Sequence, residues 1–559
     1  MTRAKRGEVL DLSNCQVLVV GAGPVGLMLA VQLARHGVIP RVIDRALGYT
    51  PYCKALAVQA RTVEIFSQIG IVDEALQVGV TLNAVNRYRE GVRTQRIVID
   101  PTPLREIPFP FVLSLEQSET ERLLGSVLLA LGGLVEWGVE LLNVFQDDHA
   151  VTALVGHEDG YQEQIRAEFV VGCDGAGSTV RRALGIPFDG ETYPEIFMLG
   201  DVEISWPLAS GESHLFQVGQ RAVLAWPIRG ENRFYISGTE HLPRSVHSDL
   251  TDEGIHLAGT YLNPPSIADI QELMHIFGPA GTVLSHLRWS SRYRVARRIA
   301  RTYRLGRVFL AGDAAHTQAT TGGQGMNTGL QDAYNLGWKL GKVLCGRCYP
   351  ALLESYHDER YLVGRQTLEI TDRAMRDWKA QDARPADSAK VREQMIARFS
   401  QLAINYRHSS AVTDFPFDLD IEAIRAGDRA PDGNVTAASS GIRRRIFDVL
   451  RGTGHHLFLF AGSEGNADAL EQLKGVAAGA SGRYGTELSC FWITPPSGSQ
   501  MLDTTIGQIL IDPESMVHKS YGATRPSLYV IRPDQYIAFR ASGDHVKELY
   551  SLLDQFLCL

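Results

Sequence analysis

The first fifty residues contain two short apolar runs separated by a helix-like pattern. Residues 16–20 form an apolar run of strand type, and residues 27–36 carry apolar side chains at helical spacing until Gly37. A second short run, residues 41–44, ends on a carboxylate. Short apolar runs favour strands and the 3.6-residue spacing favours a helix, so the pattern predicts a βαβ unit.

A glycine-rich turn, spaced Gly-x-Gly-x-x-Gly, joins the first predicted strand to the helix. In a dinucleotide-binding turn the first glycine permits the tight bend, the second lets backbone approach a pyrophosphate, and the third lets helix and strand pack closely. A carboxylate 18 residues after the last glycine can accept from ribose hydroxyls. The predicted dinucleotide site comprises Gly21, Gly23, Pro24, Gly26, Asp44 and Arg45. The alternative is a glycine-rich turn in another kind of α/β protein.

Two later segments also run from an apolar strand through a glycine-containing turn into a helix. Residues 169–181 contain an Asp-Gly pair after the strand. Residues 307–316 contain a Gly-Asp pair, and a glycine-rich loop at 322–327 and a helix at 328–344 follow. Backbone N–H groups at such a helix start can stabilise negative charge on a ligand. Taken singly, such a segment is also compatible with a plain strand–turn–helix corner.

Three such segments in this order resemble the single-component (group A) FAD-dependent aromatic hydroxylases, in particular the phenol hydroxylase-like monooxygenases. The resemblance implies that the first turn holds the ADP half of FAD. It implies further cofactor contacts, with FAD, NAD(P)H or both, by Gln117, Asp174, Gly312, Asp313, Gly323, Gly325, Met326 and Asn327. Lys54 stands where relatives usually carry an arginine, and its point charge is expected to pair with an FAD phosphate.

The resemblance also implies a reaction. NADPH or NADH reduces FAD, O₂ forms the flavin C4a-hydroperoxide, and its distal oxygen hydroxylates a phenolic or polycyclic aromatic substrate. Many relatives carry a proline pair before the flavin loop, whereas this chain has Ala319 and Thr320. That departure leaves open a Baeyer–Villiger or epoxidising attack on a polyketide-like natural product. A non-catalytic flavin-binding module is the alternative from a different class.

The same resemblance implies an α/β fold with three parts: an FAD-binding Rossmann-like domain, an inserted substrate domain with a mixed or antiparallel sheet, and a C-terminal thioredoxin-like domain. The expected boundaries are 1–190 and 291–375 for the FAD-binding domain, 191–290 for the substrate domain, 376–435 for a helix and linker, and 436–559 for the thioredoxin-like domain. Thioredoxin chemistry needs a Cys-x-x-Cys pair, but Cys490 and Cys558 stand alone in this last segment. We therefore expect this domain to serve in packing or in a homodimer.

The substrate wall is expected in the sheet between residues 197 and 238. Its inward-facing candidates are His214, Phe216, Trp226 and Tyr235, and the alternative for each is an ordinary core position. A free phenol has a pKa near 10, so activating it calls for a base or a charge-stabilising partner. The sequence does not assign that base.

Four further polar residues are expected to be structural. His316 is expected to order the loop after the Gly-Asp pair by hydrogen bonds. Glu359 is expected on a solvated helix face, and His455 and His456 in a surface turn.

Net charge and cysteine content argue against several kinds of binding partner, namely nucleic acid, membrane and metal. The 559 residues carry 55 Lys and Arg against 63 Asp and Glu, a net charge of −8, which offers no basic footprint for nucleic acid. Glycines and a proline break the uncharged run at 16–34, so we expect no membrane segment, and a cytoplasmic protein with reduced thiols. Cys345 and Cys348 have Cys-x-x-Cys spacing, but no second pair or histidine cluster completes a metal site, and a helix end is expected there.

Overall fold

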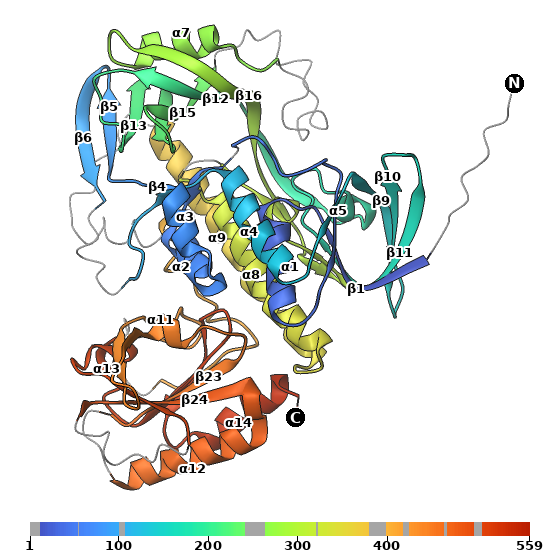
Figure 1. Ribbon diagram of the computed structural model, residues 1–559, viewed down its shortest axis with the longest axis vertical. Coiled ribbons are helices and arrows are strands. Elements are labelled where there is room, and N and C mark those ends of the chain that lie inside the picture. Colours follow the sequence, from blue (N-terminus) through green and yellow to red (C-terminus); the bar gives the residue numbers. More distant parts are fainter. Residues whose placement is uncertain are drawn as a thin grey trace, which may run out of the picture.

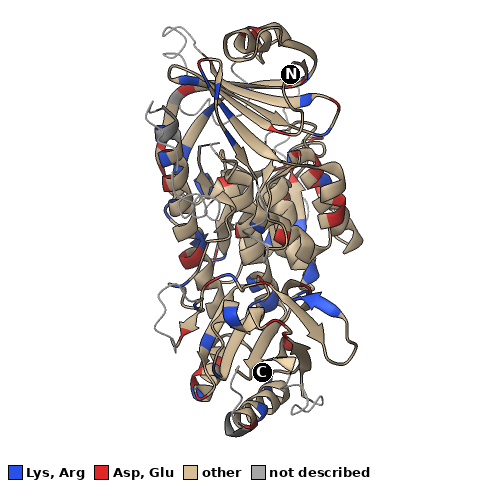
Figure 2. Ribbon diagram, turned by 90° about the vertical axis from the view of Figure 1, so that its left-hand side faces the viewer, with Lys and Arg blue, Asp and Glu red and all other residues tan. Residues whose placement is uncertain are grey.

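The computed structural model describes residues 12–53, 55–99, 107–240, 263–319, 322–379, 399–416, 424–462, 467–496 and 506–558. Three parts follow one another along the long axis of the molecule, and the C-terminal part lies at the bottom of Figure 1. Acidic and basic residues are interspersed over all three parts (Figure 2). Within the described ranges, no helix has the length and apolar character needed to cross a membrane.

The first sheet combines the N-terminal strand with strands from later in the chain. The strands are β1 (Leu12–Val20), β2 (Arg41–Asp44), β8 (Val135–Trp137), β9 (Val139–Gln146), β10 (Val151–His157), β11 (Gln162–Gly172), β17 (Arg304–Leu305) and β18 (Val308–Leu310). The main order is β17-β18-β11-β1-β2-β8, and β1 pairs in parallel with β2 and β11. Residues 17–20 of β1 are all buried, as expected for a parallel strand between helix layers.

Helices cover this sheet and complete the predicted βαβ unit. The helices of this part are α1 (Pro24–Arg35), α2 (Ala60–Ile69), α3 (Val72–Val78), α4 (Gln117–Ala130), α5 (Thr179–Ala183), α8 (Gly325–Leu344) and α9 (Ser355–Lys379). A small sheet of β3 (Ala57–Val58), β4 (Val80–Thr81) and β7 (Leu113–Ser114) accompanies them. Helix α1 packs against both α4 and α8. The order β1, α1, β2 confirms the prediction made from the apolar pattern.

The second sheet is mixed and mostly antiparallel. Its elements are β5 (Ala84–Arg89), β6 (Val92–Val98), β12 (Phe188–Ser205), β13 (Ser213–Val218), β14 (Arg221–Pro227), β15 (Arg233–Glu240), β16 (Val283–Ala300), β19 (His316–Thr317) and the covering helix α7 (Ile267–Phe277). The order is β19-β16-β12-β15-β14-β13-β5-β6, with only β13–β5 parallel. This sheet is not confined to residues 191–290, because β5, β6 and β19 come from outside that range and the long strands β12 and β16 cross its limits.

The third sheet has the thioredoxin-like order. Its elements are β20 (Thr413–Asp414), β21 (Asn434–Ala437), β22 (Arg443–Arg445), α11 (Ile446–Val449), β23 (His455–Phe460), α12 (Ala467–Tyr484), β24 (Leu488–Thr494), β25 (Gln508–Ile511), α13 (Met516–Tyr521), β26 (Ser527–Ile531), β27 (Ile537–Ser542) and α14 (Val546–Phe556). Central β23 pairs in parallel with β24 and antiparallel with β26, and β26 pairs antiparallel with β27. The three-part α/β fold predicted above is the fold observed.

Buried ion pairs join the third sheet to α8 and α9. Arg532, just after β26, binds Glu359 of α9 with its Nη1 2.6 Å from Oε1. Lys339 of α8 donates to the other oxygen of Glu359 at 2.7 Å, and Trp338 Nε1 donates to Asp534 Oδ2 at 3.0 Å. Burial lowers the pKa of Lys339 to about 8, although Glu359 opposes that shift. These groups form a charged joint between the two parts, defined here as Trp338, Lys339, Glu359, Arg532 and Asp534.

Two expectations about polar residues were wrong. Glu359 is buried rather than solvated because α9 packs against α8 and against the third sheet, whose Arg532 neutralises it. His455 and His456 are buried in β23 because this central strand begins at His455, before the apolar run that predicted it.

Candidate active site

The first glycine turn has the steric character of a dinucleotide turn. Gly21 has a φ of +101°, and a Cβ there would lie 2.5 Å from the carbonyl oxygen of Cys173. A Cβ at Gly26 would lie 1.8 Å from the carbonyl oxygen of Gly21. In front of Gly23, by contrast, a Cβ would meet nothing within 4 Å. A side chain at Gly21 or Gly26 would therefore clash with the backbone, whereas Gly23 faces open space.

The open side of this turn is the N-terminus of α1. Gly23 is the N-cap, Pro24 opens the helix, and no side chain caps the helix or places an acid in its first turn. Free N–H groups at such a terminus bind phosphate. Asp44 lies beside the turn, where its Oδ2 accepts from Ala22 N at 2.6 Å and its Oδ1 from Ala46 N at 2.8 Å. Each carboxylate oxygen has capacity for a second hydrogen bond, so Asp44 can also accept from a ribose.

Three further sequence candidates are Arg45 and Gln117, whose side chains have protein partners, and Lys54. Arg45 is exposed at the surface, 3.8 Å from Glu140. Gln117, the first residue of α4, donates to Glu121 at 2.8 Å, and Glu121 in turn accepts from Thr50 N. Lys54 lies outside the described residues.

One guanidinium ties the second motif to the third. Asp174 accepts from Val180 N at 3.1 Å, while its Oδ1 is buried without a protein partner, and burial raises the pKa of this carboxyl. Arg181, in the helix that follows, donates to Ala314 O at 2.8 Å and to Ala176 O at 2.7 Å. The Asp-Gly and Gly-Asp turns are thereby held in fixed relation.

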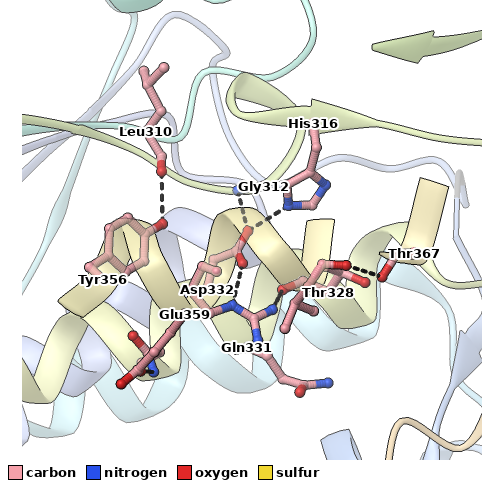
Figure 3. A network of polar contacts seen from close by, with 12 residues as sticks. Leu310, Gly312, His316, Thr328, Gln331, Asp332, Tyr356, Glu359 and Thr367 are labelled. Atoms are coloured by element: carbon pink, nitrogen blue, oxygen red, sulfur yellow. Dashed lines mark hydrogen bonds and ion pairs between the residues drawn. The ribbon is translucent and has the colours of Figure 1, made fainter. Parts of the chain in front are cut away.

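A buried carboxylate anchors the Gly-Asp turn (Figure 3). Asp332 of α8 accepts from Gly312 N at 3.0 Å, from His316 Nε2 at 2.7 Å and from Arg360 Nε at 2.7 Å. Burial alone would raise the pKa of Asp332, but Arg360 and His316 outweigh it and lower that pKa. Asp332 correspondingly raises the pKa of His316 against the effect of burial. This charged network leaves the side chain of Asp313 at the exposed surface of the turn.

Asn327 holds in place the glycine-rich loop at 322–327, which the family resemblance assigns to the flavin. The Asn327 amide nitrogen donates to Ala57 O at 2.6 Å and to Gly323 O at 2.7 Å, and its oxygen accepts from Gln59 N at 2.8 Å. Its side chain is fully buried, so it fixes the loop against β3 rather than facing a ligand. The N-terminus of α8, which includes Gly325 and Met326, carries no side-chain cap and no acid in its first turn.

The two faces of the second sheet separate the substrate candidates. Trp226 and Tyr235 lie on the face turned toward the first part, in an aromatic and aliphatic cluster with Cys53 and Leu56. His214 and Phe216 belong to the opposite face, in the core under α7. The expectation that all four share one wall was therefore wrong. Burial lowers the pKa of His214, whose Nε2 lies 2.9 Å from Ala209 O.

Sequence reasoning missed the contribution of β16 to this face. Trp289 and Tyr293 of β16 pack with the Trp226–Tyr235 cluster, and Tyr293 also packs with Phe197 and with Ala319, which precedes the glycine-rich loop at 322–327. The sequence does contain a signal for these residues. In a strand, alternate side chains lie on one face, so residues 289, 291, 293 and 295 share a face. We call Trp226, Tyr235, Trp289 and Tyr293 the aromatic face.

The donor set fits FAD on three observations of the structure. The glycine turn is closed to side chains but open before α1, a carboxylate stands at the end of β2, and α8 presents a second uncapped N-terminus. A Rossmann-like sheet with these three features defines a dinucleotide-binding flavoprotein. Residues 14–371 match the model of the FAD binding domain, and the chain belongs to that family.

Relatives of this chain act as monooxygenases. It is 31% identical over 560 residues to pentachlorophenol 4-monooxygenase of Sphingobium chlorophenolicum, covering 98% of this chain and 97% of that one. It is 31% identical to 6-methylpretetramide 4-monooxygenase of Streptomyces rimosus, covering 94% and 90%. The structure of aklavinone-11 hydroxylase with FAD and aklavinone matches with a TM-score of 0.76 at 25% identity, covering 98% and 99%. The protein is a flavoprotein monooxygenase, which displaces the alternative of a non-catalytic module.

Proposed function

We propose that this enzyme hydroxylates a phenolic or polycyclic aromatic compound with NAD(P)H and O₂ as co-substrates, in the cytoplasm where NAD(P)H is supplied. The observation that carries the substrate class is the aromatic face, which packs against Ala319 and against Cys53 and Leu56, just before the strand β3 that Asn327 holds. The names of the relatives, which include a chlorinated phenol and a polycyclic pretetramide, support the same class. Homodimer formation remains a prediction.

In this proposal FAD supplies acceptance of hydride and activation of O₂. Gly21, Gly23, Gly26 and the N-terminus of α1 hold its pyrophosphate, and Asp44 its ribose. Asp313 holds the ribitol, and the loop at 322–324 with the N-terminus of α8 faces the ring. The aromatic face orients the substrate by stacking and excludes water from the reacting atoms.

The activity test uses the FAD-loaded enzyme with NADPH or NADH and a panel of phenols, aromatic acids and polycyclic quinones. We expect at least one compound to accelerate nicotinamide oxidation and to gain one oxygen atom. The position of that oxygen distinguishes ring hydroxylation from Baeyer–Villiger or epoxide products. Steady oxidation in which every compound of all three classes yields only H₂O₂ would count against the proposed substrate class.

Alanine at Gly23 and at Gly26 is expected to act in two different ways. The Gly26→Ala Cβ meets backbone, so the apoprotein loses about 1–3 kcal/mol of stability. The Gly23→Ala Cβ meets open space at a φ of −68°, so the apoprotein keeps its melting temperature but binds FAD at least about tenfold more weakly. Thermal unfolding of apoprotein and FAD titration separate the two. Unchanged FAD affinity in Gly23→Ala would refute the pyrophosphate site.

Truncation of Trp226 and of His214 tests which face of the sheet binds substrate. We expect Trp226→Ala to raise KM for the aromatic substrate about 10-fold or more, because a large aromatic contact is lost. His214→Ala, on the face under α7, should lower stability with little change in KM. Steady-state kinetics and thermal unfolding of both variants decide the matter. A KM effect confined to His214→Ala would place the substrate on the other face.

A further inference from the structure

A segment from much later in the chain lies against the flavin loop. Phe399 places its ring where a side chain on Gly322 would stand, since a Cβ there would lie 2.6 Å from that ring. Gln324 Nε2 donates to Phe399 O at 3.1 Å, and Arg61 N donates to Ser400 O at 3.2 Å. The segment 399–401 therefore packs against the loop at Gly322 and Gln324 and against the first turn of α2.

Gln401 connects this segment to α8 through a chain of buried amides. Its Nε2 donates to Gln324 Oε1 at 2.9 Å and to Thr328 Oγ1 at 3.0 Å. Gln331 Nε2, one turn further along α8, donates to Gln401 Oε1. Gln324 Nε2 then donates to Gly322 O at 2.9 Å. All three glutamine side chains are buried, and the amide nitrogens of Gln401, Gln324 and Gln331 each have a protein acceptor, while Oε1 of Gln331 has no protein partner.

The backbone of Gln401 is held in an unfavourable conformation. Its φ is +62°, in the left-handed region that favours glycine and, to a lesser degree, asparagine. Such conformations persist where the surrounding contacts fix them, and they concentrate at functional sites. Glycine would relieve the backbone here but would remove the amide that joins Gln324, Thr328 and Gln331. The strained backbone therefore belongs to a residue whose side chain bonds to Gln324, Thr328 and Gln331.

We propose that Gln401 is a positioning residue for the flavin ring. It fixes Gln324, the N-cap of α8, so that the loop at 322–324 and the first N–H groups of α8 present their dipoles at a constant place. This inference rests on the proposed location of the ring against that loop. Fixed N–H dipoles stabilise negative charge, so they favour reduced over oxidised flavin.

The expected consequence of losing the Gln401 amide is a change in the bound flavin itself. Without the constraint, the loop dipoles average over several orientations, and the reduction potential of bound FAD becomes more negative. FAD affinity should fall about 2–10-fold, the range of one or two lost hydrogen bonds. The share of oxidised NAD(P)H that ends as H₂O₂ should rise. A purely structural role would lower the melting temperature without moving the potential.

The experiment measures the midpoint potential and visible spectrum of FAD bound to Gln401→Gly and Gln401→Asn in the full chain. Both replacements tolerate the left-handed backbone, so if one variant fails to fold the other decides. The control is Gln535→Gly: Gln535 is also buried, has a φ of +67°, and its side chain contacts Arg61 rather than the loop. We expect a more negative potential in the Gln401 variants and a wild-type potential in the control.

Two other results would overturn the inference. A wild-type potential and spectrum in the Gln401 variants would refute the positioning role alone and leave the proposed function intact. An equal shift in Gln535→Gly would show a general packing effect. Failure of the wild-type chain to bind FAD would instead refute the proposed cofactor placement on which the inference rests.

Discussion

Replacing Asp332 by asparagine is expected to cost about 3–5 kcal/mol of folding stability and to release most of the bound FAD. Asp332 is the ionic partner of Arg360 and a hydrogen-bond partner of His316, and all three side chains are buried. The amide removes the negative charge and also turns an NH₂ group toward one of three donors. The Gly312 turn, which carries Asp313, then loses its anchor. Thermal unfolding and flavin retention after gel filtration measure the two effects.

The matched control for that result is Asp358→Asn. Asp358 is exposed in α9, close in sequence to Arg360, and its replacement should change the melting temperature little. An Asp332→Asn protein with wild-type melting temperature and a full complement of FAD would show that the network is not needed for the turn.

Acidification is expected to destabilise the C-terminal part through His456. Burial, with a contribution from Lys342, lowers the pKa of His456 to about 4, so this side chain is neutral in the folded state. An unfolded histidine titrates near 6.5, so below that pH the unfolded chain binds a proton that the folded chain does not. Stability from this group is therefore complete above pH 6.5 and is lost as the pH falls toward 4. Between pH 7 and pH 5 the loss is about 2 kcal/mol.

The direction of this pH dependence can be tested with His456→Phe. The new ring would pack against Phe491, whose ring centroid lies 5.6 Å from that of His456. Denaturant unfolding at pH 7 and pH 5 should show a smaller pH dependence in His456→Phe than in wild type. Burial also lowers the pKa of His455 and His36, so part of the dependence remains. His149→Gln, at an exposed position, should keep the wild-type slope. Identical slopes for His456→Phe and wild type would contradict the assignment.

Local features were predictable from the sequence because they depend on neighbours along the chain. Gly26 is required by a contact with Gly21 inside the βαβ unit, whereas Gly21 is enclosed by Cys173 from outside it, yet the spacing of three glycines is enough to find both. Likewise the apolar positions 17–20 and 42–43 identify the buried centres of β1 and β2, since parallel strands covered on both faces have continuous apolar runs. The three strand–turn–helix motifs followed from such segments, and the order of the three parts followed from the family resemblance that these motifs carry.

The faces of the second sheet could not be predicted, because they depend on strand register. His214 pairs with Ala225 across the β13–β14 hairpin, and paired residues share a face. Trp226, one residue further on, therefore points to the other side. A shift of register by one residue would have reversed the assignment, and the sequence between these strands does not specify it.

Glu359 shows a second limit, which is tertiary contact at long range. Its neighbours in sequence, Asp358 and Arg360, suggest a solvated helix face, yet its charge partner Arg532 lies 173 residues away. Asn327 shows a third: its motif indicated a ligand contact, whereas its amide is fully engaged with β3 and the loop. In both cases the sequence did not indicate which groups the side chain contacts.

The four charged residues of the joint, Lys339, Glu359, Arg532 and Asp534, limit which segments can be exchanged between this protein and its relatives. A buried carboxylate deprived of its cation costs several kcal/mol, so neither side of the joint can be replaced independently. A hybrid that takes its last third from a relative would retain Glu359 and Lys339 but depend on the donor for Arg532 and Asp534. Successful exchange of C-terminal segments within the family therefore requires transferring these four charges as one inherited unit.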